Sequence, residues 1–141
     1  MLRFFYEPEE LIGKEILVLV NLESKKFKGI ESQGMILAVD VDEYSVVYAG
    51  SKGINAIQSD LFQNVDGKFD LVIFNPPYLP KDIKEKKETA RLVSGGRVGN
   101  ELINEFLSKS GDYLNSNGKI LLAFSSLSGD VLGCIDKNGF R

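Results

Sequence analysis

Asn75, Pro76, Pro77 and Tyr78 form a short segment directly after the apolar run 69–74. Two consecutive prolines fix φ and remove two backbone donors, so the chain must leave a strand abruptly there. Asn75 would then lie at the carboxyl end of that strand, where open α/β sheets bind their ligands. The Asn75 side-chain oxygen and the Pro76 carbonyl offer two acceptors that suit a substrate amino or amide NH2 aligned for attack. Tyr78 would supply a flat face for a planar group.

The same four residues also have a purely structural interpretation. Asn-Pro commonly opens a turn, and a Pro-Pro loop can simply end a buried strand. A motif gains weight from its structural context, so the surrounding elements must decide between the two interpretations.

Asp40 and Asp60 are further candidate site residues: Asp60 precedes the apolar pair Leu61-Phe62, and Asp40 ends the apolar run 35–40, which predicts a strand. A carboxylate at such a strand end can accept hydrogen bonds from ribose hydroxyls. Asp is also a common turn residue, so a structural role is the alternative for both.

Periodicity and turn residues predict the elements that must hold these side chains. Apolar runs predict strands at 15–21, 35–40 and 69–74, and apolar residues at helical spacing predict a helix over 99–114. The other expectations are a helical turn at 8–13, a polar loop at 22–34, a turn at 115–118, a buried strand at 119–124 and a last helix at 129–137. Together these elements predict an α/β fold.

Two segments stay open between alternatives. Residues 43–49 fit a short helix capped by Asp42, yet the stretch 44–48 also has the composition of an antiparallel strand. The mixed-charge run 81–91 fits a solvated loop or exposed helix, and also a lid that contacts substrate.

Length and composition limit the classes of protein. At 141 residues the chain is one domain's worth and short for a complete doubly wound sheet. The net charge of −3 disfavours a general nucleic-acid surface, although local basic patches remain open. Because histidine is absent and Cys134 is the single cysteine, we expect no metal site and no disulfide, with Cys134 packed as a small apolar residue. No signal peptide and no apolar run of ~20 residues is visible, so a soluble, cytoplasmic protein is expected.

The stretch 53–140 carries an ordered set of motifs around the tetrapeptide. They are 55–62 (NAIQSDLF), 69–80 (FDLVIFNPPYLP), 94–99 (SGGRVG) followed by an amphipathic helix, and 118–126 (GKILLAFSS). This stretch resembles the S-adenosylmethionine-dependent methyltransferases of the NPPY group, most closely the HemK-type glutamine methyltransferases in their shorter archaeal and eukaryotic form. The resemblance implies a Rossmann-like, mostly parallel sheet with S-adenosylmethionine as methyl donor.

The resemblance also implies roles for individual donor-site residues. Asp40 would accept hydrogen bonds from the donor's ribose, Asp60 would lie near the adenine amino group, and Leu61 would pack against the adenine ring. Asn75 would lie where the donor and the acceptor meet.

On the acceptor side, the resemblance makes Asn75, Pro76, Pro77 and Tyr78 the catalytic loop. In the family the acceptor is a glutamine side-chain amide of a translation release factor, and a small activating subunit is a common partner. An exocyclic amine of adenine satisfies the same geometry, so the acceptor stays open between the two, with the acidic net charge favouring a protein.

The first third of the chain resembles a different family. Residues 6–37 are similar to the second half of the tRNA-binding OB-fold that is appended to methionyl-tRNA synthetases. This resemblance implies tRNA contacts by Asn21, Lys26, Lys28 and Ser32. The run 22–35 also lacks the glycine-rich turn with which a methyltransferase approaches its donor.

We therefore expect a single α/β domain over 1–141, with an OB-fold-like β segment at 1–37 and a truncated methyltransferase-like segment at 38–141. The function expected is methyl transfer from S-adenosylmethionine to an amide or amino nitrogen. An inactive methyltransferase-like remnant or fusion and a tRNA-binding module are the alternatives.

Overall fold

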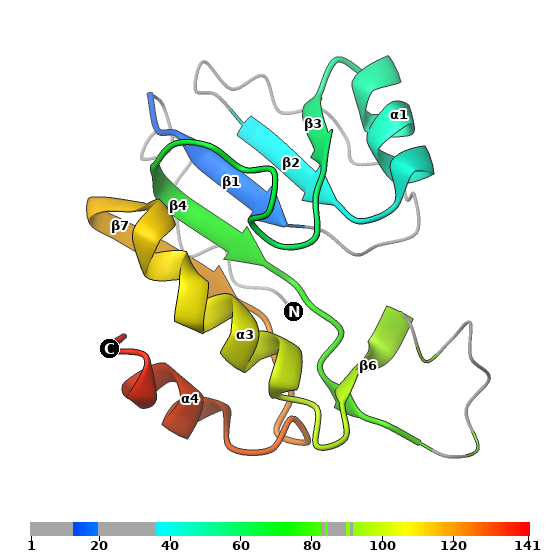
Figure 1. Cartoon of the computed structure of the whole chain (residues 1–141), viewed down its shortest axis with the longest axis vertical. Coiled ribbons are helices and arrows are strands. Elements are labelled where there is room, and N and C mark those ends of the chain that lie inside the picture. The colour runs from blue at the N-terminus through cyan, green and yellow to red at the C-terminus, as the bar shows by residue number, and fades with distance from the viewer. Residues whose placement is uncertain (1–12, 20–35, 83, 85–89, 91) are drawn as a thin grey trace.

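The computed structural model describes residues 13–19, 36–82, 84, 90 and 92–141. Its main feature is a five-stranded sheet of order β3-β2-β1-β4-β7, in which neighbouring strands are parallel (Figure 1). The strands are β1 (Ile16–Leu19), β2 (Ile36–Asp40), β3 (Asn55–Gln58), β4 (Phe69–Phe74) and β7 (Leu114–Leu122). The predicted α/β fold with a mostly parallel, Rossmann-like sheet is confirmed.

Helices and a small second sheet accompany the main sheet. The helices are α1 (Glu43–Ser51), α3 (Glu101–Ser110), which runs on into a 3-10 turn (Gly111–Tyr113), and α4 (Val131–Lys137). The second sheet is the parallel pair β5 (Leu79–Pro80) and β6 (Ser94–Gly96). In Figure 1, α3 lies over β4 and β7 with α4 beside it, whereas α1 lies next to β3 at the other edge of the sheet.

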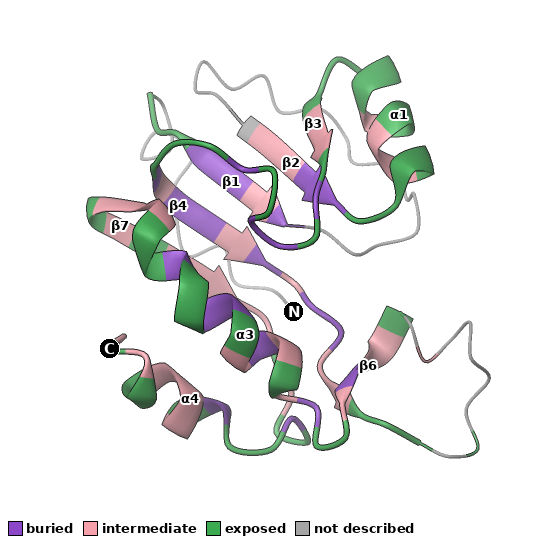
Figure 2. Ribbon diagram, viewed as in Figure 1, coloured by how far each residue is buried: buried purple, intermediate pink, exposed green. Residues whose placement is uncertain are grey.

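The core lies between the sheet and α3 (Figure 2). Ile103, Phe106 and Leu107 are buried because they recur at helical spacing on one face of α3. The ring centroid of Phe106 lies 4.3 Å from that of Phe74 in β4 and 5.4 Å from that of Phe62, which follows β3. This aromatic column ties α3, the end of β4 and the turn after β3 into one cluster.

β1 and β2 belong to the same sheet as the later strands. Ile16 pairs with Ile36 of β2 on one side and with Leu71 of β4 on the other, so β1 is the central strand. The boundary predicted at residue 37 falls within β2, and the division into two segments remains a prediction. The polar loop predicted at 22–34 lies outside the described residues, as does most of the turn predicted at 8–13.

The alternative left open at 43–49 is resolved in favour of a helix. Asp42 is the N-cap of α1, since its Oδ2 accepts hydrogen bonds from the Ser45 backbone N–H at 2.8 Å and from the Ser45 hydroxyl at 2.9 Å. The local cap outweighs the strand composition of the segment. α1 is described over its whole length and buries none of its residues.

The prediction of a turn at 115–118 is wrong. β7 already begins at Leu114, which pairs with Phe69, and the register then shifts before Leu71 pairs with Lys119. Gly118 allows this irregularity, because a Cβ there would approach the Phe69 carbonyl oxygen to 2.8 Å. The helix predicted to end at 114 accordingly ends at Ser110.

The strand predicted as buried at 119–124 is also wrong in its burial. None of the nine residues of β7, all of them described, is buried, because β7 is an edge strand of the sheet. The last helix begins at Val131, two residues later than predicted, because Asp130 caps it by accepting a hydrogen bond from the Gly133 N–H at 2.8 Å.

The remaining expectations concern Cys134, the segment 81–91 and the possibility of a membrane span. Cys134 is half-buried beside the core cluster, as expected of a small apolar residue. In the segment 81–91, Lys81, Asp82 and Lys84 are exposed, and most of the other residues lie outside the described part. No helix in the described part of the chain combines the length and apolar character that a membrane span requires.

Candidate active site

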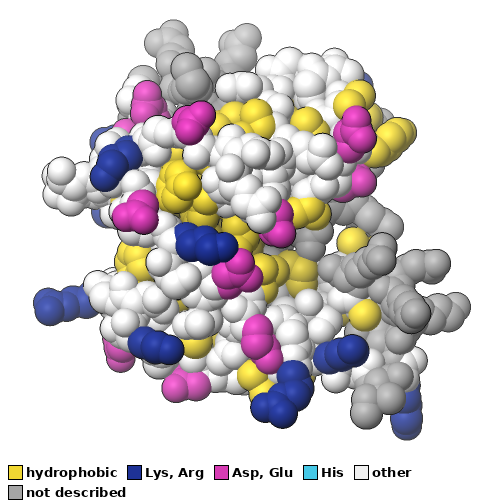
Figure 3. Space-filling view, viewed as in Figure 1, with side chains coloured by type: hydrophobic (Ala, Val, Ile, Leu, Met, Phe, Trp, Pro, Cys, Tyr) yellow, Lys and Arg dark blue, Asp and Glu magenta, His cyan; other side chains and the backbone are white. Residues whose placement is uncertain are grey.

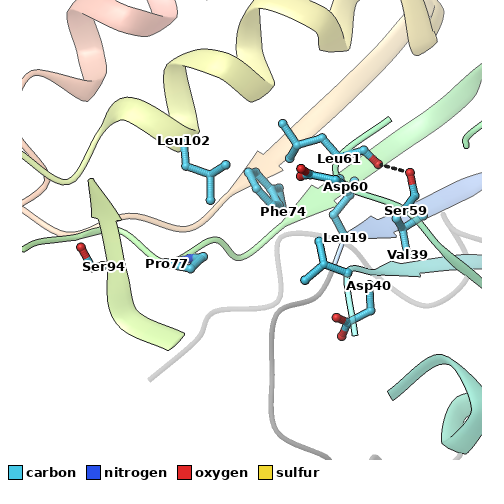
Figure 4. A pocket seen from close by; sticks show the side chains of 11 residues that line it. Leu19, Val39, Asp40, Ser59, Asp60, Leu61, Phe74, Pro77, Ser94 and Leu102 are labelled. Atoms are coloured by element: carbon cyan, nitrogen blue, oxygen red, sulfur yellow. Dashed lines mark hydrogen bonds between the residues drawn. The ribbon is translucent and has the colours of Figure 1, made fainter. Parts of the chain in front are cut away.

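A pocket of about 200 Å³ lies at the carboxyl ends of β1 to β4 (Figure 4). The chain leaves β1 toward β2 and β3 on one side and returns to β4 on the other, and open α/β sheets bind ligands at such a reversal. The lining residues are Leu19, Val39, Asp40, Val41, Ser59, Asp60, Leu61, Phe74, Pro77, Ser94 and Leu102. Figure 3 shows apolar side chains gathered in the middle of the view, between the half that holds β2 and β3 and the half that holds α3.

Asp40 ends β2 at the rim of this pocket, and only 6% of its surface is exposed. Its Oδ1 accepts a hydrogen bond from the Asp42 N–H at 2.9 Å. Burial raises the pKa of Asp40 above its ordinary value, and the hydrogen bond from Asp42 opposes that rise only in part. The protein thus holds a desolvated carboxylate at a strand end, an arrangement that suits recognition of hydroxyl or amino donors.

The turn after β3 holds Asp60 and Leu61. Ser59 anchors it, because its buried hydroxyl donates to the Leu61 carbonyl at 3.1 Å and accepts from the Asn64 N–H at 2.9 Å. Leu61 has a φ of +51°, which is uncommon for a residue other than glycine and persists only where the surroundings enforce it. Asp60 is exposed, and in Figure 4 its carboxylate lies at a different end of the pocket from that of Asp40.

Phe62 completes this turn from the core side. Its ring stacks on Tyr113 at a centroid distance of 4.3 Å, and its carbonyl accepts the Tyr113 hydroxyl at 3.3 Å. The turn that carries Asp60 and Leu61 is therefore fixed by buried aromatic packing.

The predicted catalytic loop follows β4 directly. Pro76 and Pro77 are buried, while Asn75 and Tyr78 are half-buried, and Tyr78 packs against the core cluster. β7 pairs with β4 up to its end, and the Ala123 N–H donates to the Phe74 carbonyl just beyond β7 at 3.0 Å. Asn75 therefore starts from a backbone held on both sides, since β1 pairs with β4 along its other edge.

The structure brings together several residues that the sequence singled out. Asp40, Asp60, Leu61 and Pro77 line one pocket. Asn75, Pro76 and Tyr78 adjoin that pocket along the chain without lining it. The residues predicted to contact tRNA lie outside the described part: Asn21, Lys26, Lys28 and Ser32.

Sequence reasoning missed the other walls of the pocket. Ser94 comes from β6 and Leu102 from α3, and Ser59 anchors the turn after β3. Ser94 and Leu102 belong to elements predicted for other reasons, and only tertiary packing brings them to the strand ends. The described residues contain no cluster of three or more His, Cys, Asp and Glu side chains suited to a metal ion.

Known proteins resemble this chain in two ways: some are similar to its first third, and others are similar to most of its length. Residues 2–56 match the family model described as "Putative tRNA binding domain". A methionine–tRNA ligase of Pyrococcus horikoshii is 52% identical over 42 residues, which are 30% of this chain and 6% of that protein. The described strands within 2–56 nevertheless lie in the parallel sheet, with β1 and β2 paired in parallel.

Solved structures share the fold of the whole chain. The Mtq2–Trm112 complex of E. cuniculi, responsible for methylation of the translation termination factor eRF1, matches with a TM-score of 0.60 and 21% identity, over 93% of this chain and 74% of that one. A ribosomal protein L11 methylase from Lactobacillus delbrueckii subsp. bulgaricus matches with a TM-score of 0.62 and 15% identity, over 95% of this chain and 65% of that one. Both likenesses show the methyltransferase fold.

One relative is similar to this chain in sequence over most of its length. A protein of Methanocaldococcus jannaschii named "Putative protein N5-glutamine methyltransferase" is 34% identical over 149 aligned residues, covering 89% of this chain and 74% of that protein. The similarity thus extends over most of both chains and accompanies the strand-end pocket and the Asn-Pro-Pro-Tyr loop, so the chain belongs to the protein N5-glutamine methyltransferase family.

Proposed function

We propose that this chain transfers a methyl group from S-adenosylmethionine to the side-chain amide nitrogen of a glutamine in a translation release factor, in the cytoplasm. The observation that carries the proposal is that the Asn75 loop and the strand-end pocket lie next to each other in a member of this family. The loop with Asn75 and Pro76 leaves β4 beside a pocket that holds Asp40 and Asp60. The solved relative with the same fold acts on a translation termination factor.

The residues present fit the donor. The desolvated Asp40 carboxylate suits the ribose hydroxyls, Asp60 suits the adenine amino group, and Leu61 and Phe74 offer apolar surface to the adenine ring. The pocket of about 200 Å³ is smaller than the roughly 300 Å³ at which drug-sized ligand sites begin. These residues therefore hold the nucleoside part of the donor and leave the methyl group toward the Asn75 loop.

The chemistry needs no nucleophile from the protein. The acceptor nitrogen attacks the sulfonium methyl carbon, the carbon–sulfur bond breaks with its electron pair going to sulfur, and the nitrogen releases a proton to solvent. The protein's part is orientation: the Asn75 side-chain oxygen and the Pro76 carbonyl accept the two amide N–H groups and aim the nitrogen at the methyl group. The half-buried Tyr78 packs on the amide plane.

A protein partner beside β3 is part of the proposal. β3 is an edge strand in the described sheet, and the adjoining α1 region exposes the apolar side chains of Val41, Tyr44, Val47 and Ile54. An unpaired strand edge next to exposed apolar side chains suits association with a second chain. The solved relative occurs as a complex with Trm112, and we assign a partner subunit of this chain to this edge.

The direct test is methylation of a purified release factor by the full chain with S-adenosylmethionine, followed by peptide mass spectrometry. We expect one added methylene on a glutamine, and none with Asn75→Ala. If the donor binds but wild-type chain leaves the factor unmodified, also in the presence of the partner subunit, the proposed acceptor is wrong.

The tRNA-binding alternative is supported by the match over residues 2–56. It predicts tRNA affinity that falls steeply with added salt, because lysine contacts to phosphate release counterions. Gel-shift titration of wild type and of a Lys26→Ala, Lys28→Ala double variant at two salt concentrations tests it. Equal, salt-insensitive affinities would remove this alternative.

A further inference from the structure

β6 and the turn that joins it to α3 contact the backbone of the proposed catalytic loop. A Cβ at Gly95 would lie 2.6 Å from the Pro77 carbonyl oxygen, and a Cβ at Gly99 would lie 2.6 Å from the Tyr78 carbonyl oxygen. Real side chains do not approach a backbone oxygen that closely, so only glycine fits at either position. The carbonyl groups of Pro77 and Tyr78, which are consecutive in the loop, therefore lie against Gly95 and Gly99.

Glu101 holds the turn from the other side. Its Oε1 accepts the Val98 N–H at 3.0 Å, and its Oε2 accepts the Gly99 N–H at 3.0 Å. The same carboxylate also occupies the space that a Cβ at Gly96 would need. One side chain thus fixes the path of the chain from Gly96 to Gly99.

Glu101 is the first residue of α3, and the packing of this helix holds the Glu101 backbone in place. Asn100, the N-cap residue, makes no capping side-chain hydrogen bond within the described part of the chain, and the Glu101 carboxylate bonds to N–H groups of the turn that precedes the helix. Ile103 in the same turn and Phe106 in the next are fully buried in the core. The buried face of α3 therefore anchors the carboxylate to the core.

From these contacts we infer that Glu101 is a positioning residue for methyl transfer: its carboxylate holds the Gly96–Gly99 turn, and Gly95 and Gly99 in turn set the backbone of the Asn75 loop. This inference rests on the proposed function for its catalytic meaning. It assigns the orientation of the acceptor to a carboxylate that touches neither donor nor acceptor.

The first experiment separates collision with the loop from backbone strain. Gly99 and Gly67 have similar positive φ values, +92° and +97°, but a Cβ at Gly67 would meet nothing within 4 Å. We expect Gly99→Ala to lower the kcat of methyl transfer at least roughly tenfold, while Gly67→Ala retains it, because misplacement of reacting groups by about 1 Å costs up to 10²-fold. Equal kcat values in the two variants would overturn the role of the turn.

The second experiment compares Glu101→Gln with Glu105→Gln. Glu105 is an exposed carboxylate one turn further along α3, and its partner is Lys109 at 2.7 Å. We expect Glu101→Gln to lower kcat while the Kd for S-adenosylmethionine stays within about twofold of wild type, because Glu101 itself does not line the donor pocket. Glu105→Gln should match wild type in both quantities.

Hydrogen exchange supplies a readout that does not depend on turnover. The Lys81 N–H donates to the Gly96 carbonyl at 2.9 Å, just after the catalytic loop. Glu101→Gln should speed exchange of the Lys81 amide relative to Glu105→Gln. Unchanged exchange would show that Glu101 does not hold the Gly96–Gly99 turn in place, and faster exchange with unchanged kcat would overturn its role in positioning the loop for methyl transfer. Absence of methyl transfer in wild type would instead count against the proposed function. The exchange comparison would then still test whether Glu101 holds the Gly96–Gly99 turn.

Discussion

The half of the molecule built from β4, β6 and α3 is packed differently from the half built from β2, β3 and α1. In the first half Phe106 is fully buried between aromatic neighbours, and the loop after β4 lies against Gly95 and Gly99. In the second half α1, described over its whole length, buries none of its residues, and Tyr44 is 74% exposed. The loop after β4 is therefore held by contacts within the chain, whereas the side chains of α1 beside β3 are exposed or half-buried.

The largest expected difference between the two halves is in the loss of stability on truncating a side chain in each, with Phe106 as the residue in the first half. Phe106→Ala removes the middle ring of the column that joins Phe62 to Phe74, and a buried Phe-to-Ala change costs about 3–5 kcal/mol of stability. Tyr44→Ala on α1 should stay within about 0.5 kcal/mol of wild type, because the side chain is exposed. Urea denaturation of both variants measures the difference, and similar losses would remove the contrast between the halves.

Loss of the Asn75 side chain should come next. Asn75→Ala removes one of the two acceptors that orient the substrate nitrogen, so kcat should fall roughly 10²-fold or more while the fold is retained. Asn117→Ala, at an exposed position of β7, serves as the control. Methyl-transfer assays at saturating donor make the comparison, and a kcat for Asn75→Ala close to that of the control would refute the assigned role.

The pH dependence of donor binding sharpens the assignment of Asp40. Burial raises the pKa of Asp40 above its ordinary value of 3.8, so its contribution to stability is complete below 3.8 and is lost as pH rises through the raised pKa. The ribose hydroxyls need the ionised carboxylate, so donor affinity should weaken as pH falls toward the raised pKa. Calorimetry across this range should show a pH-dependent Kd in wild type and a flatter profile in Asp40→Asn. Identical profiles would place the ribose elsewhere.

The smallest effect concerns Glu101. Partial burial raises the pKa of its carboxyl, but hydrogen bonds from backbone N–H groups, including those of Val98 and Gly99, outweigh burial and hold the pKa below the ordinary value of 4.5. The stability that this lowered pKa provides is present above pH 4.5 and is lost as pH falls through the lowered pKa. Thermal melts should therefore show the stability gap between wild type and Glu101→Gln closing on acidification. A gap that is constant with pH would contradict this.

The sequence predicted the parts of the site that local patterns encode. A mostly apolar run with two prolines just after it predicts both β4 and the abrupt exit at Asn75, and the structure has that strand at Phe69–Phe74. The α1 segment stayed ambiguous because aromatic and β-branched residues favour strands, and only the Asp42 cap decides for a helix. The irregular start of β7 resembled a turn, since its Asn, Ser and Gly residues are typical of turns.

Contacts between distant segments were beyond prediction from the sequence. Ser94 reaches the pocket only because β6 pairs with β5. Glu101 had the spacing of an ordinary exposed helix residue, and its bonds to the preceding turn depend on two glycines at positive φ, Gly96 and Gly99. The half built from β4, β6 and α3 thus combines a motif that the local sequence encodes with contacts that form only in the folded chain.

The most direct test of the account is a calorimetric titration of S-adenosylmethionine into the full chain, with Asp60→Ala and Asn75→Ala measured alongside. Asp60 follows β3 and Asn75 follows β4, so we expect binding in wild type that is weakened by Asp60→Ala and retained by Asn75→Ala. No binding in wild type, or equal loss in both variants, would contradict the assignment of a donor pocket beside a separate acceptor loop.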